Sequence, residues 1–127
     1  MDAATRDSVR RRAENRCEYC LLPQEFSVLA HHIEHIVAIQ HGGPSTTGNL
    51  ALACQRCNRH KGPNLSGIDP VGGEVVPLFH PRRDRWSEHF LFRGAFIEGI
   101  TPTGRATVRV LAMNGARRVD LRSRLDF

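Results

Sequence analysis

Two Cys-x-x-Cys pairs constrain the fold of this 127-residue chain more than any other feature. Each pair lets two sulfur atoms reach one ion from a single tight turn, and two pairs complete the four-thiolate tetrahedral shell of structural zinc. Thirty-three residues separate the pairs, so one ion would clip together the two ends of everything between them. The spacing therefore predicts a structural Zn²⁺ held by Cys17, Cys20, Cys54 and Cys57.

Other interpretations of the cysteines are a redox dithiol, an iron–sulfur cluster and a chance arrangement. A redox dithiol usually comes as a single pair, and the spacings of iron–sulfur motifs differ from this one. A doubled pair favours zinc over all three, and in so small a domain the bound metal contributes directly to folding.

The N-terminus and the apolar runs of the chain indicate its cellular compartment. The N-terminus is polar and lacks the apolar core of a secretory signal, and no apolar run approaches the roughly 20 residues of a membrane span. We therefore expect a cytoplasmic protein with no membrane partner, in which closely spaced cysteines bind metal more readily than they form disulfides.

The charge points to a polyanionic partner. The net charge is +5, and of the 18 basic residues all but Lys61 are arginines. The planar guanidinium pairs with phosphate oxygens at two points, so a small chain of this composition indicates nucleic acid. A solvated surface rich in arginine explains the charge equally well, so the charge alone does not decide.

Apolar periodicity and turn residues predict short elements of both kinds in one domain. The first half is expected to contain a helix over residues 3–15, a strand over 28–39, a strand over 49–53 and a helix over 54–61. The second half is expected to contain a turn-rich stretch over 64–73, a strand over 74–79, a hairpin over 88–100, a helix from Thr101-Pro102 to Asn114-Gly115 and a loose tail over 116–127.

The first predicted strand carries two groups that suit hydrolysis, Glu34 and His35. Successive side chains of a strand point to opposite faces. The pleat often breaks near the end of a strand, however, and we expect such a break to let both side chains reach one cleft. The order and spacing exclude the His-Glu-x-x-His pattern of zinc proteases.

The stretch from Cys17 to Gly62 resembles the HNH endonucleases, whose core is the ββα-metal fold. The matching strings are His32–Val37, His41–Gly43, Asn49–Cys54 and Cys57–Gly62, and the cysteine pairs lie where the zinc-containing branch of the family has them. The resemblance implies an α+β fold in which a small ββα-metal (His-Me finger) core is stapled by a four-cysteine zinc site. We expect a single domain over 1–127, with the core at about 17–62 and a hairpin-plus-helix extension at about 68–127 that resembles the extension of a bacterial subgroup.

Roles follow from the resemblance, position by position. His35 matches the general base that takes a proton from water, and Glu34 matches the acidic ligand of a catalytic divalent ion. Asn49 matches the asparagine that shapes the loop and helps hold the histidine. Asn58 matches a second ligand of the ion, and His60 is a nearby candidate ligand. Carboxylate and amide oxygens suit Mg²⁺ or Mn²⁺, whereas a histidine ligand would admit other divalent ions.

The resemblance therefore implies a metal-dependent endonuclease that hydrolyses DNA phosphodiester bonds with low sequence specificity and leaves 5′-phosphate and 3′-hydroxyl ends. The expected partner is double-stranded DNA. The residues expected to contact phosphates are Arg56, Arg59, Lys61, Arg11, Arg12 and Arg16. The alternative is a non-catalytic zinc-stapled module that binds nucleic acid. That alternative explains the cysteines and arginines but gives no reason for Glu34-His35 together with the two asparagines.

Overall fold

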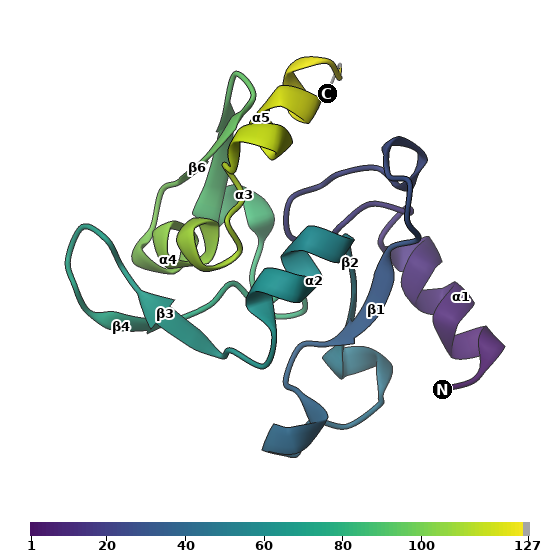
Figure 1. The fold of residues 1–127 in the computed structure, drawn as a ribbon. Helices are drawn as coiled ribbons and strands as arrows, with labels where there is room; N and C mark the ends of the chain where they lie inside the picture. Colours follow the sequence, from purple (N-terminus) through teal and green to yellow (C-terminus); the bar gives the residue numbers. More distant parts are fainter. Residues whose placement is uncertain (126–127) are drawn as a thin grey trace. The chain divides into compact units, whose positions relative to one another are not determined.

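The computed structural model describes residues 1–125, and in it the chain forms two compact units (Figure 1). The first unit comprises Met1–Pro63 and His80–Arg83, and the second comprises Asn64–Phe79 and the chain from Asp84 onward. Both units mix helices with two-stranded antiparallel ribbons, which confirms the predicted α+β class. The division into a core and an extension of one domain stays a prediction, and the last two residues of that extension lie outside the described residues.

The first unit contains a ββα arrangement. Its elements are α1 (Ala3–Arg12), β1 (His32–His35), β2 (Leu50–Ala53), α2 (Gln55–Lys61) and short 3₁₀ helices at Gln24–Phe26, Ile39–His41 and Thr47–Asn49. β1 and β2 pair in antiparallel register, with His32 opposite Ala53 and His35 opposite Leu50. α2 follows β2 after a single residue and packs against both strands (Figure 1). The predicted second strand and short helix are confirmed.

Helix α1 begins and packs for local reasons. The Asp2 side chain accepts a hydrogen bond from the backbone N–H of Thr5 at 2.8 Å, which satisfies one of the helix's unpaired donors. Val9 is fully buried and, with Ala13, packs against Leu50 and Leu52 of β2. The predicted helix is confirmed, but it ends at Arg12 because residues 14 and 15 both adopt a φ of 54°.

The predicted strand over 28–39 is wrong in length, because β1 covers only His32–His35. Val28 and Leu29 are exposed, so their β-branched and apolar side chains have no sheet surface to cover. The partner strand β2 is only four residues long. Beyond it, the backbone of residues 36 and 37 bonds to Asn49, and the chain then turns into a 3₁₀ helix.

The second unit consists of two hairpins and three helices among the described residues. Its elements are β3 (Ser66–Ile68), β4 (Val75–Pro77), α3 (Trp86–His89), β5 (Phe90–Arg93), β6 (Phe96–Gly99), α4 (Pro102–Val110) and α5 (Ala116–Ser123). α4 begins where predicted, since the Thr101 hydroxyl accepts a hydrogen bond from the N–H of Gly104 at 2.9 Å and proline occupies the first turn. The predicted hairpin and this helix start are confirmed, but α4 ends at Val110 and not at the predicted Asn114-Gly115.

Two expectations for the second unit are wrong. The stretch over 64–73 contains strand β3, and the tail contains helix α5. Arg118 and Arg122 are buried and anchor this helix, because their guanidinium groups donate to backbone carbonyls, including Leu111 O at 2.7 Å and Met113 O at 2.6 Å. Arginines that suggest a solvated tail therefore satisfy buried backbone acceptors instead.

A buried carboxylate ties two segments of the second unit together. The Asp69 side chain is 2% exposed and accepts two hydrogen bonds of 2.8 Å from Nε and Nη2 of Arg105. The bonds from Arg105, followed by one from the backbone N–H of Val71, hold the pKa of Asp69 well below its ordinary value.

The stability of the second unit is therefore expected to fall in acid. A depressed carboxylate pKa contributes stability above the unfolded-state value of about 4, and this contribution is lost as the pH falls below that value. Asp69→Asn is expected to lower the melting temperature at pH 7 and to flatten its decline between pH 5 and 2. The fluorescence of Trp86, the single tryptophan, reports this transition from within the second unit. An unchanged acid profile in the variant would contradict the prediction.

Candidate functional site

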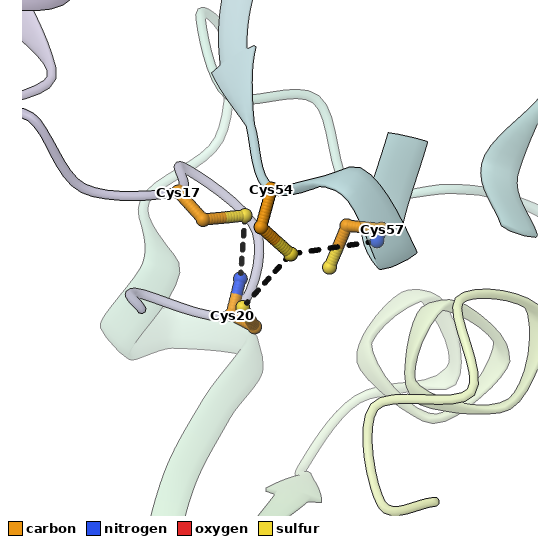
Figure 2. A group of neighbouring side chains, drawn as sticks. All are labelled: Cys17, Cys20, Cys54 and Cys57. Carbon is orange, nitrogen blue, oxygen red and sulfur yellow. Dashed lines mark hydrogen bonds between the residues drawn. The ribbon is translucent and has the colours of Figure 1, made fainter. Parts of the chain in front are cut away.

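The sulfur atoms of Cys17, Cys20, Cys54 and Cys57 converge on one point in the first unit (Figure 2). The four sulfurs lie within 4.8 Å of one another, and those of Cys20 and Cys54 are 3.7 Å apart. Tetrahedral zinc with Zn–S bonds of about 2.3 Å places its sulfurs about 3.8 Å apart, whereas a disulfide needs about 2.05 Å. The geometry fits a single structural zinc ion.

Local backbone structure places these thiols. In the first pair, the Sγ of Cys17 accepts from the N–H of Cys20 at 3.4 Å, and Leu21 adopts a φ of 64° that turns the chain back. In the second pair, Cys54 is the N-cap of α2 and its Sγ accepts from the N–H of Cys57 at 3.5 Å. Each pair thus presents two sulfurs from one turn, as the spacing predicts.

The burial of these thiols favours binding of a metal ion. All four are buried, and burial raises the pKa of Cys17 and of Cys57 well above the ordinary value. A thiol so placed ionises readily only beside a cation. Within the described part of the chain, this is the one place where three or more Cys, His, Asp or Glu side chains converge closely enough to hold an ion.

Glu34 and His35 have different surroundings. The strand runs through His35, and the bend comes only at residues 36 and 37. The Glu34 side chain is 5% exposed; Oε1 accepts from the hydroxyl of Tyr19, and Oε2 lies 3.5 Å from Nζ of Lys61. Burial raises the pKa of Glu34, and the charge of Lys61 offsets part of this effect. The half-buried His35 has its Nε2 2.9 Å from the Oγ of Ser45.

Lys61 faces the interior. Its side chain is 3% exposed, and besides Glu34 it donates to the backbone carbonyl of Ile36 at 2.9 Å. The sequence places Lys61 among the phosphate contacts, but here its ammonium is enclosed and is not offered to a phosphate. Instead it fixes the carbonyl of the residue that follows His35.

Asn49 clamps the loop between the two strands. Its Oδ1 accepts from the N–H of Val37, and its Nδ2 donates to the carbonyls of Val37 and Pro44, each at 2.9 Å. Gly43 lies so close that an added Cβ would be 1.7 Å from the carbonyl oxygen of Val37. The loop therefore needs glycine at this point and an amide at 49, which is the geometry that a loop-shaping asparagine requires.

The remaining predicted residues lie on the two helices. Asn58 is half-buried on α2, where Arg56, Arg59 and His60 are exposed. Within residues 1–125, no hydrogen bond joins the Asn58 side chain to Glu34 or His35. The structure thus puts the two proposed ligands of a catalytic ion on neighbouring elements without linking them.

The arginines on and after α1 differ in how their side chains are placed. Arg12 donates to the carbonyls of Thr47 and Leu50, at 3.0 and 2.7 Å, so it fastens the helix to the end of the loop. Arg11 and Arg16 are exposed. Of the three, these two match the expected surface position.

Sequence reasoning did not single out the two residues inside the first cysteine pair. Tyr19 is fully buried against Glu34. Glu18 forms an ion pair with Arg82 and also accepts from the N–H of Leu52 at 2.8 Å. A long charged or aromatic side chain between two metal ligands is a signal for such contacts, since the turn holds it rigidly. Ser45 carried no comparable signal.

The first unit thus contains a ββα module, a hairpin followed by a short helix, with four cysteines placed to hold one metal ion and a histidine at the end of the first strand. Residues 17–64 match the family model of the HNH endonucleases, so this segment is an HNH domain, and the resemblance seen in the sequence is confirmed. The match ends beside the boundary between the two units. No curated protein and no solved structure matches the chain significantly. Among the described residues, no helix has the length and apolar character needed to cross a bilayer.

Proposed function

We propose that this protein is a metal-dependent endonuclease that hydrolyses double-stranded DNA with low sequence preference. The observation that carries the proposal is the presentation of His35 at the end of β1, within an HNH domain whose following backbone is clamped by Asn49 and Lys61. The side chain of His35 is half-buried, and an imidazole can act as a general base at neutral pH.

In this proposal His35 takes a proton from the attacking water, and the water oxygen bonds to phosphorus. The bond from phosphorus to the 3′ oxygen breaks, and that oxygen takes a proton from solvent. Glu34 and Asn58 would hold Mg²⁺ or Mn²⁺, with His60 as a further candidate ligand. Each Glu34 oxygen keeps a lone pair beyond its present partner, so the oxygen donor set fits such an ion. When bound, the ion supplies positive charge for the phosphate and the leaving oxygen.

Exposed arginines are proposed to hold the DNA backbone. The candidates are Arg56 and Arg59 on α2 and Arg11 and Arg16 near α1. Arg12 would contribute only with the part of its guanidinium group that is not hydrogen-bonded to the loop carbonyls. Contacts of this kind position the duplex without reading its sequence. Because four closely spaced cysteines are unbridged, we place the activity in a reducing compartment such as the cytoplasm.

A plasmid-nicking assay tests the proposal. The native protein is expected to convert supercoiled plasmid to relaxed or linear product with Mg²⁺ or Mn²⁺ and not without them. A strong chelator would also strip the sulfur site, so the ion-free arm is prepared by dialysis and its zinc content is verified. Duplex RNA in place of DNA tests the choice of substrate. Binding without cutting under every condition would overturn the proposal.

One observation favours the second candidate function, a non-catalytic module that binds nucleic acid. The carboxylate of Glu34 is enclosed and already paired with an ammonium and a phenol. In a non-catalytic module, Glu34 and Lys61 would only stabilise the interior of the first unit.

Paired substitutions separate these two roles of Glu34. Glu34→Gln is expected to cost about 3–5 kcal/mol, because it leaves the buried Lys61 ammonium unpaired. The double variant Glu34→Gln with Lys61→Met removes both charges and is expected to regain most of that stability. If Glu34 is an ion ligand, neither variant nicks DNA. Nicking by the double variant at the native rate would remove Glu34 from the proposed ion site.

A further inference from the structure

We propose that Ser45 is a positioning residue that holds the imidazole of His35 through Nε2 and leaves Nδ1 to receive the proton. This inference rests on the proposed role of His35 as the general base. It concerns a residue of the loop that no sequence pattern singled out.

The contact between the two side chains is well formed. The distance between Ser45 Oγ and His35 Nε2 is 2.9 Å, within the ordinary range of a hydrogen bond. Within residues 1–125, neither side chain has another hydrogen-bond partner. The torsion that turns an imidazole is broad, so a half-exposed ring without this bond would sample many orientations.

Hydrogen bonds to the loop backbone hold Ser45 in this position. The carbonyl of Pro44, directly before Ser45, accepts from Nδ2 of Asn49 at 2.9 Å. The same amide holds both backbone groups of Val37, two residues after His35. One side chain therefore fixes the backbone directly before the serine and the backbone two residues after the histidine.

Gly43 tightens this arrangement. The place where its Cβ would be is 2.8 Å from Nδ2 of Asn49 and 1.7 Å from the carbonyl oxygen of Val37, so the middle of the loop packs against both of these residues. Ser45 itself is exposed, and among the described residues its hydroxyl bonds only to the ring. The serine is thus placed by the backbone, and not by burial of its own side chain.

In this inference His35 is the Nε2–H tautomer. With Nε2–H donating to the serine oxygen, the lone pair lies on Nδ1, which has no described partner. A ring held at one nitrogen presents the other in a fixed direction. Nδ1 is then the atom that takes the proton of the attacking water.

Kinetics of Ser45→Ala test the proposal. We expect kcat for nicking to fall about tenfold with KM nearly unchanged, because binding is intact and only the orientation of the base is lost. Ser45→Thr keeps the hydroxyl and is expected to restore most of kcat. The control Thr46→Ala removes an exposed hydroxyl from the adjacent loop position and is expected to behave like the native protein. All three variants are expected to melt at the native temperature.

A second test of the inference uses NMR spectroscopy and does not depend on nuclease activity. In nitrogen-15 spectra of the histidine rings, His35 is expected as the Nε2–H tautomer, and its Nε2 resonance should shift in Ser45→Ala and not in Thr46→Ala. An unshifted resonance, or a native kcat in Ser45→Ala, would overturn the inference. If the native protein cuts no nucleic acid, the proposed function fails and the spectra alone decide whether Ser45 holds the ring.

Discussion

Cys54→Ser is expected to abolish zinc binding and to unfold the first unit. Serine is a good N-cap, so the variant keeps the capping capacity that Cys54 provides at the start of α2 and loses only the thiolate. Binding of structural zinc is worth about 10–16 kcal/mol in small domains. That is as large as the whole stability of a typical domain, about 5–15 kcal/mol. The loss of one of four sulfurs should therefore exceed what the small apolar cluster of α1 and β2 can supply.

The measurement combines zinc content with the dispersion of backbone amide resonances. Native protein stripped by a strong chelator provides the matched control and should resemble the variant. Added zinc should restore the stripped native protein and not Cys54→Ser. A variant that retains the native melting transition without zinc would show that the sulfur cluster is not what holds the ββα module together.

His35→Ala is expected to reduce nicking by about 10²–10⁴-fold, the range contributed by a positioned general base. The side chain is half-buried and has one hydrogen-bond partner within residues 1–125, so its removal should leave the fold unchanged. DNA affinity is expected to stay at the native level, because the proposed phosphate contacts come from the arginines. Single-turnover nicking, a gel-shift titration and a melting curve measure the three quantities separately.

His32→Ala is the matched control for this experiment. His32 is an exposed histidine on the same strand, and no role in the reaction is proposed for it. It should nick DNA at the native rate. Equal losses in both variants would indicate damage to the hairpin, and native nicking by His35→Ala would remove the proposed base.

The parts of the fold that depend on neighbouring residues were predictable. The cysteine spacing predicts the sulfur site, because two tight turns are enough to aim two sulfurs each. The N-cap Thr101 predicts the helix that follows it, since a capping bond spans only three residues. The strand at Leu50–Ala53 and helix α2 follow from the short apolar run and the glycine-proline stop at residues 62 and 63.

The parts of the fold that depend on partners far away in the sequence were not predictable. Arg118 and Arg122 resemble solvated charges in the sequence, and only their buried carbonyl partners explain helix α5. Lys61 resembles a phosphate contact until the carbonyl of Ile36 and the carboxylate of Glu34 are found beside it. Long side chains reach partners that no local pattern identifies.

The sequence by itself determined that this chain carries four convergent thiols and the residue types of an HNH domain, because ligand spacing and capping act over a few residues. Only the tertiary structure decided what each charged or polar side chain faces. It enclosed Glu34 with Tyr19 and Lys61, and it set the hydroxyl of Ser45 against His35. The physical reason is that burial and hydrogen bonding are settled by whichever segments the folded chain brings together, and those segments are far apart in the sequence.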